Sequence, residues 1–566
     1  MATIIKNTIT AIATFCAIFP AAAQLCNYEV PVGYCLEANR TRETIQTIVM
    51  PELDMKKIEE EDKLDEMNNL PLRFGYSHKV KLDLTNSGTW HLLSNGDKLW
   101  RLNIVCPKAK SVSFNFDKFW LPEGGKFFVY SSDKKQSLGA FTSRNVVGDS
   151  INANELATGI LYGEDMTLEY YQPKEVTSKA VISIDYVIHG YKGTLFRMAT
   201  FGSSGSCMVN VNCEEGQNWQ NEKKAIAFVV LQGRILCSGA LLATTDMSQE
   251  PFFLTANHCI NGLGDATGSS TLNNSTLFYW NYEMPGCIND SIQPIYYHTR
   301  GATIVANNSS SDFALLRLIE DPKDLPNYTP YYLGWDWSGN AGDPGVCIHH
   351  PKGDVKKIST IDESPVPAYY TPGVAGGSHW KVYWKETLNG YGTVEKGSSG
   401  APLLTSDHRV IGQLHKSATE GCNSPYLFSR FGKFSVSWTG NNNDSICRRI
   451  DHWLDPQSTG AKTTEGLLVI RHDSTISNNQ QIYGNIYITR NAQLKISGNI
   501  EMMGNSRIVI DDGSTLIIDG GTLSNAALDL RPGGALYILN NGVVYTQNGF
   551  EAPTGANLNI AQGTIF

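Results

Sequence analysis

Three short segments of this 566-residue chain carry the residue types needed for acyl transfer by a serine hydroxyl. His258 follows an apolar run and precedes a cysteine, Asp312 opens a second apolar run, and Ser399 stands between glycines. A serine nucleophile needs a base to take its proton and a buried carboxylate to hold that base in one tautomer. The order His, Asp, Ser, with separations of 54 and 87 residues, therefore predicts a catalytic triad.

The glycines around Ser399 suggest how an oxyanion would be held. Gly397 and Gly400 allow a tight turn, so the backbone N–H groups of Gly397 and Ser399 could converge on one oxygen. Each segment is weak evidence by itself, because Gly-Ser-Ser-Gly is common in linkers and single histidines are usually structural. Their coincidence in one part of the chain favours an enzyme.

The elements that must position these residues are mainly strands. Apolar and polar residues alternate between about residues 71 and 200, for example at Val112, Phe114 and Phe116, which predicts a β-rich region. We divide the chain into a signal peptide (1–23), an N-terminal block (24–201), a middle block that carries the chemistry (202–460) and a C-terminal block (461–566).

Two helices are expected outside the strands. One contains the acidic stretch at residues 59–62. The other closes the middle block, where Ile446, Ile450 and Trp453 recur at helical spacing and Pro456 ends the helix.

The C-terminal block repeats with a period near 20 residues. Two series of apolar pairs step together by 22 and then 20 residues: Leu494/Ile496, Leu516/Ile518 and Leu536/Ile538, and Ile486/Ile488, Ile508/Ile510 and Leu528/Leu530. A fixed period of short strands predicts a small parallel β-solenoid, in which each coil buries its apolar side chains on the next. An antiparallel sandwich with a coincidental repeat is the alternative.

The first residues have the three parts of a secretory signal: a positive charge at Lys6, an apolar run over 9–19 and a small-residue cleavage site at 21–23. The apolar run is too short to span a membrane, and no later stretch approaches that length. A net charge of −9, from 46 Lys+Arg and 55 Asp+Glu, gives no basic footprint for nucleic acid. We therefore expect an exported protein with no integral membrane segment, in an oxidising setting that permits disulfides.

The middle block resembles the trypsin-like serine proteases and, more closely, the bacterial lysyl endopeptidases. The general motifs are T-A-x-H-C at 255–259 and G-x-S-G-x-P at 397–402. Segments typical of the closer group, W-N-Y, S-D-F, G-W-D, I-H-H-P, G-Q-L-H and S-W-T-G, recur at 280–282, 311–313, 334–336, 348–351, 412–415 and 437–440. The resemblance implies a mainly β protein with a double β-barrel protease domain over about 202–460 and a propeptide domain before it.

The resemblance also assigns roles. It makes His258 the general base, Asp312 the residue that orients it, and Ser399 the nucleophile. It implies three disulfides: Cys207–Cys422, Cys213–Cys287 and Cys237–Cys259. No metal or cofactor is expected, because adjacent histidines such as His349 and His350 point to opposite faces of a strand and cannot chelate together.

Five further cysteines remain after the signal. Cys26 and Cys35 are close enough in sequence to pair with each other. Cys347 and Cys447 lie in apolar contexts that favour buried thiols, and Cys106 has no argued partner.

We expect Ser429, His415 and Lys416 to line the substrate site. Ser429 occupies the position at which lysyl endopeptidases hold the substrate lysine with an aspartate, and a neutral hydroxyl cannot offset the cost of burying an ammonium group. Lys416 would favour an acidic substrate if it faced the pocket, and would be a solvated rim residue otherwise. The resemblance also implies a mature start at Gly202, which follows Phe201; if the enzyme makes this cut itself, rather than another protease, the pocket accepts a large apolar side chain. The residue preference stays open.

The sequence supports two functions from different classes. The first is a bacterial serine endopeptidase, secreted or at the cell surface, made as a zymogen and acting on protein or peptide substrates. The second is a non-catalytic surface or adhesin-type binding protein built on a protease fold. The intact triad favours the first. A third possibility concerns only the tail, which could dock a substrate or a cell surface.

Overall fold

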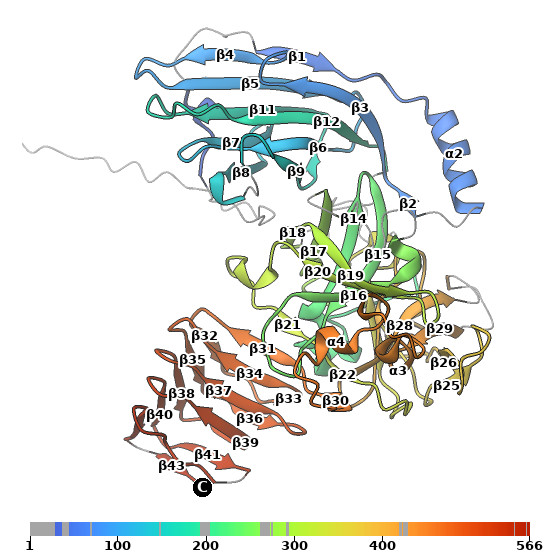
Figure 1. Cartoon of the computed structure of the whole chain (residues 1–566), viewed down its shortest axis with the longest axis vertical. Coiled ribbons are helices and arrows are strands. Elements are labelled where there is room, and N and C mark those ends of the chain that lie inside the picture. Colours follow the sequence, from blue (N-terminus) through green and yellow to red (C-terminus); the bar gives the residue numbers. More distant parts are fainter. Residues whose placement is uncertain are drawn as a thin grey trace, which may run out of the picture.

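The computed structural model describes residues 29–36, 45–67, 71–145, 149–192, 204–260, 272, 275–289, 294–417, 421–422, 428–547, 549–561 and 563–566. The predicted signal peptide, the Cys26–Cys35 pair and the expected mature start at Gly202 lie outside what it describes. The protein is mainly β, as predicted, and its three blocks follow one another along the long axis (Figure 1). No described helix is long and apolar enough to cross a membrane.

The N-terminal block contains two β-sheets and two helices, α1 (Val32–Leu36) and the expected acidic helix α2 (Met55–Met67). One sheet has the order β1 (Gln46–Val49), β5 (Lys98–Val105), β11 (Asp165–Gln172), β7 (Lys126–Ser131) and β8 (Ser137–Phe141), with β4 (Thr89–Leu92) beside β5. The other has the order β10 (Leu161–Tyr162), β6 (Ser111–Trp120), β12 (Val181–Gly190) and β3 (Gly75–Asp83), with β9 (Asn154–Ala157) beside β6. Phe114 and Phe116 of β6 enter the core between them, as the alternation predicts.

The middle block is the double β-barrel that carries the candidate site. Its first sheet has the order β18 (Tyr297–Arg300), β17 (Thr276–Trp280), β14 (Ile226–Leu231), β15 (Arg234–Leu241), β16 (Phe252–Ala256), β20 (Phe313–Leu318) and β19 (Ala302–Asn308). Its second sheet has the order β13 (Val209–Asn210), β24 (Lys357–Thr360), β23 (Val346–His349), β27 (Pro402–Leu404), β28 (Arg409–Ser417), β29 (Phe428–Lys433), β26 (His379–Tyr383) and β25 (Val366–Ala368). Short 3-10 helices connect the strands: η2 (Glu214–Trp219), η3 (Glu222–Ala225), η4 (Asn257–Ile260), η5 (Pro322–Asp324) and η6 (Pro351–Gly353).

The prediction of one continuous closing helix is wrong. The segment forms two short pieces, η7 (Ile446–Arg448) and α4 (Asp451–Leu454), after a separate helix α3 (Phe434–Thr439). Arg449 between the pieces has extended backbone (φ −144°, ψ 152°). Arg448 Nη1 donates to the backbone and side-chain oxygens of Asn307 at 3.1 and 3.0 Å. A tertiary contact therefore accompanies a break that helical spacing alone does not show.

The C-terminal block is the predicted parallel β-solenoid. One face is β31 (Leu467–Ile470), β34 (Asn485–Ile488), β37 (Arg507–Ile510) and β39 (Thr522–Leu530); a second is β32 (Ser474–Ile476), β35 (Gln493–Ile496), β38 (Thr515–Asp519), β40 (Ala535–Leu539) and β42 (Asn557–Ile560). A third contains β33 (Gln480–Ile482), β36 (Asn499–Met502), the first part of β39, β41 (Gly542–Thr546) and β43 (Gly563–Ile565). Ile486 pairs with Ile508, and Ile508 with Leu528, so the repeat read from the sequence is the strand register.

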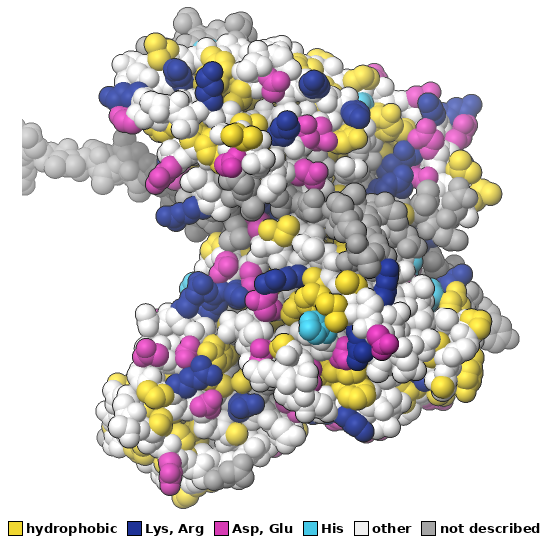
Figure 2. Space-filling model, viewed as in Figure 1, with side chains coloured by type: hydrophobic (Ala, Val, Ile, Leu, Met, Phe, Trp, Pro, Cys, Tyr) yellow, Lys and Arg dark blue, Asp and Glu magenta, His cyan; other side chains and the backbone are white. Residues whose placement is uncertain are grey.

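The solenoid continues the middle block without a gap between cores. β21 (Tyr331–Tyr332) pairs with β31, and β22 (Gly334–Asp336) pairs with β30 (Thr463–Thr464). The His408 ring stacks between Trp219 and Tyr483, with ring centroids 4.0 and 3.7 Å away. Acidic and basic side chains are interspersed over the visible face of all three blocks (Figure 2).

Candidate active site

His258 and Asp312 lie where two paired strands end. β16 and β20 are antiparallel, with Ala256 opposite Phe313, so the residues just beyond these ends come together. His258 Nδ1 is 2.7 Å from Asp312 Oδ2, and the His258 backbone N–H donates to Oδ1 at 2.9 Å. Asp312 is 4% exposed and has φ of +59°, a left-handed conformation that aspartate tolerates better than most residues. The contact fixes the tautomer in which Nδ1 carries the proton and Nε2 is free to act as a base.

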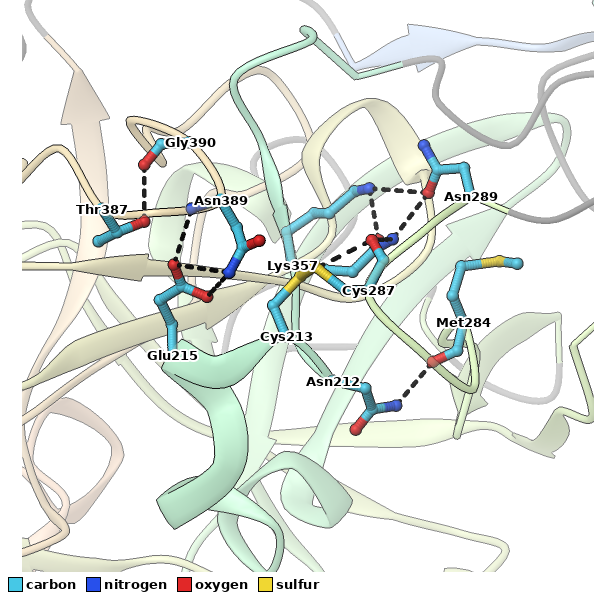
Figure 3. Close-up of a disulfide and its surroundings, with 11 residues drawn as sticks. Asn212, Cys213, Glu215, Met284, Cys287, Asn289, Lys357, Thr387, Asn389 and Gly390 are labelled. Atoms are coloured by element: carbon cyan, nitrogen blue, oxygen red, sulfur yellow. Dashed lines mark hydrogen bonds between the residues drawn. A yellow bond between two sulfur atoms is a disulfide. The ribbon is translucent and has the colours of Figure 1, made fainter.

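The three disulfides implied by the resemblance are present: Cys207–Cys422, Cys213–Cys287 and Cys237–Cys259. Cys237–Cys259 ties β15 to the residue after His258. Around Cys213–Cys287, Lys357 Nζ approaches Asn289 Oδ1 and Asn212 Nδ2 donates to the carbonyl of Met284 (Figure 3). These links brace the loops of the middle block; Cys106 and Cys347 are buried free thiols, whereas Cys447 is only half-buried.

Ser399 lies in a turn with two unused backbone donors. The N–H groups of Ser398, Gly400 and Ala401 donate to the carbonyl oxygens of Glu395, Leu414 and Ser398. Within the described part of the chain, the N–H groups of Gly397 and Ser399 have no acceptor. Unpaired N–H groups are rare in a largely buried turn, because each one costs free energy.

The turn packs directly on β15 and on β16, the strand that leads to His258. The Ser399 carbonyl accepts from Ser238 N at 2.9 Å, and the Gly397 carbonyl accepts from Ser238 Oγ at 2.9 Å. Gly400 has φ of +81°, and a β-carbon there would collide with Thr255 Oγ1 and the Ser238 carbonyl oxygen. Glycine at position 400 therefore allows the Ser399 turn to approach β15 and the end of β16. β16 ends two residues before His258.

His349 braces this turn from behind, and sequence reasoning missed that role. Its Nδ1 is 2.8 Å from Ser398 Oγ and its Nε2 is 3.0 Å from Ser359 Oγ. Ser359 Oγ donates to the Thr393 carbonyl and so accepts from Nε2–H, which leaves Nδ1 to accept from Ser398. Burial lowers the pKa of His349 to about 3, which keeps the ring neutral. His350 instead contacts the Asp354 carbonyl through Nδ1, so the two histidines serve separate contacts.

A second chain of side chains reaches Asp312 from β28. Leu414 opposes Phe431 and Lys416 opposes Arg430, so His415 is the extra residue of a β-bulge. Bulges next to active sites redirect side chains, and here His415 Nε2 lies 3.6 Å from Asp312 Oδ2. The structure therefore brings His415 to Asp312, although the sequence analysis placed it only at the substrate pocket.

His379 on β26 extends that chain. Its Nε2 is 2.8 Å from His415 Nδ1, and its Nδ1 is 2.6 Å from Ser378 Oγ. The Asp312 carboxylate can only accept, so its position 3.6 Å from His415 Nε2, longer than a hydrogen bond, favours N–H on Nε2 and leaves Nδ1 to accept from His379. Burial, with the neighbouring His415, lowers the pKa of His379 to about 3. The result is a line of side chains, Ser378, His379 and His415, that leads to Asp312.

Ser429 is fully buried within a neutral hydrogen-bond chain. Trp384 Nε1 donates to Ser429 Oγ at 3.1 Å, Ser429 donates to Ser417 Oγ at 3.2 Å, and Ser417 donates to the Phe428 carbonyl at 3.3 Å. No carboxylate of the described residues takes part in this chain. Lys416, opposite Arg430 on the next strand, is exposed.

Comparison with known proteins points to one family for the middle of the chain. Residues 201–426 match the family model described as lysyl endopeptidase, C-terminal domain. A lysyl endopeptidase from Pseudomonas aeruginosa is 29% identical over 262 residues, 44% of this chain and 52% of that protein. This chain therefore spans about half the length of the curated relative it matches.

Solved structures also align with part of the chain, among them the following one. It is the crystal structure of Rv3671c from M. tuberculosis H37Rv in an inactive form, with 15% identity over 38% of this chain and 84% of that chain. Its TM-score of 0.25 is too low to support an argument about the fold.

Proposed function

Since the middle block is lysyl endopeptidase-like, we propose that this chain is a secreted serine endopeptidase acting through a covalent acyl-enzyme. The observation that carries the proposal is the His258–Asp312 pair beside a turn with two unused donors, on Gly397 and Ser399. A turn with only a structural role would gain by pairing those N–H groups. An enzyme that forms an oxyanion needs them free.

The proposed mechanism gives each of these groups a defined role. The Ser399 hydroxyl oxygen bonds to the carbonyl carbon of the scissile peptide while its proton moves to His258 Nε2. The carbonyl π electrons pass to oxygen, which accepts hydrogen bonds from the N–H groups of Gly397 and Ser399. The C–N bond then breaks, and His258 gives its proton to the departing amine. Water repeats these steps on the ester and restores the Ser399 hydroxyl, while Asp312 stays ionised and holds the imidazolium.

We propose further that the pocket accepts a large uncharged side chain rather than lysine. The hydroxyls of Ser429 and Ser417 and the indole N–H of Trp384 form a neutral chain whose hydrogen bonds are already made. A buried substrate ammonium without a carboxylate partner would cost several kcal/mol. The Phe201–Gly202 sequence at the expected mature start is consistent with an apolar preference if the enzyme cuts itself there.

The N-terminal block is proposed to keep the enzyme latent until it is removed. β2 (Leu72–Arg73) adds as an antiparallel strand to β15 at Arg234 and Ile235, and Arg234 Nη2 bonds Asp65 Oδ2 at 2.9 Å. Figure 1 shows this segment descending from the N-terminal block onto the β14–β15 hairpin. Ser238, three residues along β15, contacts the Ser399 backbone, so the added strand and the proposed nucleophile both contact β15.

A fluorophosphonate probe tests the proposal. We expect the protein freed of residues 24–201 to be labelled at Ser399, Ser399→Ala to lose all labelling, and the exposed control Ser445→Ala to label like the wild type. Absence of labelling from correctly folded, processed protein would favour the non-catalytic binding protein. Digestion of an unbiased peptide library tests the pocket, because predominant cleavage after lysine would contradict the assignment of Ser429.

A further inference from the structure

Three cations lie side by side on the strands next to the candidate site. Arg430 on β29 is opposite Lys381 on β26 and opposite Lys416 on β28. Among the ion pairs of the described residues, none includes Lys381, Lys416 or Arg430. The chain as a whole carries a net charge of −9, so this unneutralised basic cluster stands out against its surroundings.

Aromatic rings hold the cluster in place without neutralising it. Lys381 Nζ lies 4.5 Å from the Tyr383 ring centroid and 4.2 Å from that of Phe428. The Arg430 guanidinium carbon lies 5.2 Å from the Phe428 centroid and 5.6 Å from that of Tyr370. Cation–π contacts orient charged groups but leave their hydrogen-bond donors available. Tyr370 and Tyr383 are each 43% exposed, so the cluster is open to a ligand.

The cluster adjoins the candidate triad. The Tyr370 ring lies 4.8 Å from the His415 ring, and His415 contacts Asp312. Lys416 follows His415 in the chain. A ligand bound to the cluster would therefore lie close to the proposed catalytic groups, because Lys416 is next in sequence to His415, which contacts Asp312.

The edge of β28 offers an extended peptide a way to reach the cluster. Pairing of β28 with β27 ends at Gln413, and Leu414 makes the last backbone bonds to the Ser399 turn. Within the part of the chain that the structure describes, His415 and Lys416 have no strand partner on that side. A peptide can add to such an edge as a further strand, with its side chains alternating between the two faces.

We propose that the Lys381–Lys416–Arg430 cluster is a subsite for acidic side chains of the substrate, on the amino-terminal side of the scissile bond. The inference rests on the proposed function and adds a preference outside the pocket at Ser429. Carboxylates match the cluster because Arg430 can bind one through two parallel hydrogen bonds, while the lysines add point charges. The two sites together would select an acidic stretch followed by an uncharged residue.

The test uses the processed protein and fluorogenic peptides that share one residue before the scissile bond. Glu, Gln or Lys is placed at the second to fourth positions upstream of that bond. We expect kcat/KM to be about three- to tenfold higher for Glu than for Gln, as for a few partly exposed charge pairs. The ratio should fall towards one at 1 M salt, where the Debye length is about 3 Å.

Two variants and a matched control locate the effect. Lys416→Gln and Arg430→Gln should each reduce the Glu/Gln ratio, whereas Lys462→Gln, which removes an exposed charge elsewhere, should leave it unchanged. The rate of fluorophosphonate labelling, which does not depend on upstream residues, reports whether each variant is folded. Equal kcat/KM for Glu and Gln in a protein that labels normally would overturn the subsite alone. Loss of labelling in the wild type would instead overturn the proposed function.

Discussion

The middle block and the C-terminal solenoid are both built from short strands, but they bury different groups. The middle block encloses charged and polar side chains, among them His349, Lys356 and Gln413, at 0% exposure. The solenoid fills its coils with residues such as Ile486 and Ile508, also at 0% exposure. The difference shows that the same secondary structure can serve a precise site or a repeating support, according to what its strands enclose.

The buried charges of Lys356, Lys223 and Glu283 in the middle block depend on one another. Lys356 Nζ and Lys223 Nζ lie 2.9 and 2.7 Å from the two Glu283 oxygens. Burial alone would raise the pKa of Glu283, but the two ammonium groups lower it to about 2. Such a core tolerates little change, since removal of one partner leaves a buried charge unpaired. The apolar coils should instead respond only to lost volume.

Lowering the pH should produce the largest difference in stability between the middle block and the solenoid. Burial lowers the pKa values of His298 and His349 to about 3, from an ordinary 6.5. The unfolded chain therefore binds more protons between pH 6.5 and 3, so the folded state loses stability as the pH falls through that window. At a maximum of about 1.4 kcal/mol per pH unit for each histidine, two of them cost up to about 4 kcal/mol from pH 6.5 to 5.

Amide hydrogen exchange measures this contrast directly. We expect β18 and β23, which carry His298 and His349, to lose protection at pH 5, while β37 and β38 keep theirs, because His472 is the one histidine of residues 461–566 and it is exposed. Equal loss of protection in both blocks would show that buried histidines do not control acid sensitivity.

A cavity created by mutation in the solenoid core should have the next largest effect on stability. Ile508→Ala removes a fully buried side chain and should lower the free energy of unfolding by about 2–5 kcal/mol. Ile560→Ala, at a side chain that is 41% exposed, should have a much smaller effect. Denaturant unfolding measures both. Fluorophosphonate labelling at 25 °C should remain normal, and its loss would mean that the solenoid core and the site are not independent.

The smallest expected effect concerns His379, a positioning residue that acts through His415. His379→Ala should lower kcat about tenfold with KM unchanged, because His415 loses the donor to its Nδ1. Without that donor His415 protonates more readily, and its charge opposes the imidazolium of His258 in the transition state. Activity should therefore be lost at a higher pH than in the wild type. His379→Gln, which keeps an N–H donor, should restore part of the wild-type profile, whereas a merely structural role predicts no such shift.

The sequence predicts those residues of the site that lie in short, recognisable motifs. His258, Asp312 and Ser399 each lie in a short motif, so their region could be recognised without knowing any contact. The solenoid was predictable for a similar reason, because its 20- and 22-residue steps are its strand register.

The parts that escaped prediction depend on contacts between distant segments. His379 meets His415 only because β26, β29 and β28 are neighbours, and the bulge that redirects His415 is defined by pairing with β29. The closing helix failed for the same reason, because Arg448 is engaged with Asn307. Periodicity describes one segment at a time and carries no information about such partners.

The stacking of the solenoid coils fixes a length scale. Parallel strands are spaced by about 4.8 Å, so the four steps from β32 through β35, β38 and β40 to β42 extend about 19 Å. Insertion or deletion of one coil of 20 or 22 residues would change the reach of the tail by one such step, without altering the strands that contact the middle block. The length of the solenoid is therefore set by its number of coils, and each added or removed coil changes that length by about 5 Å.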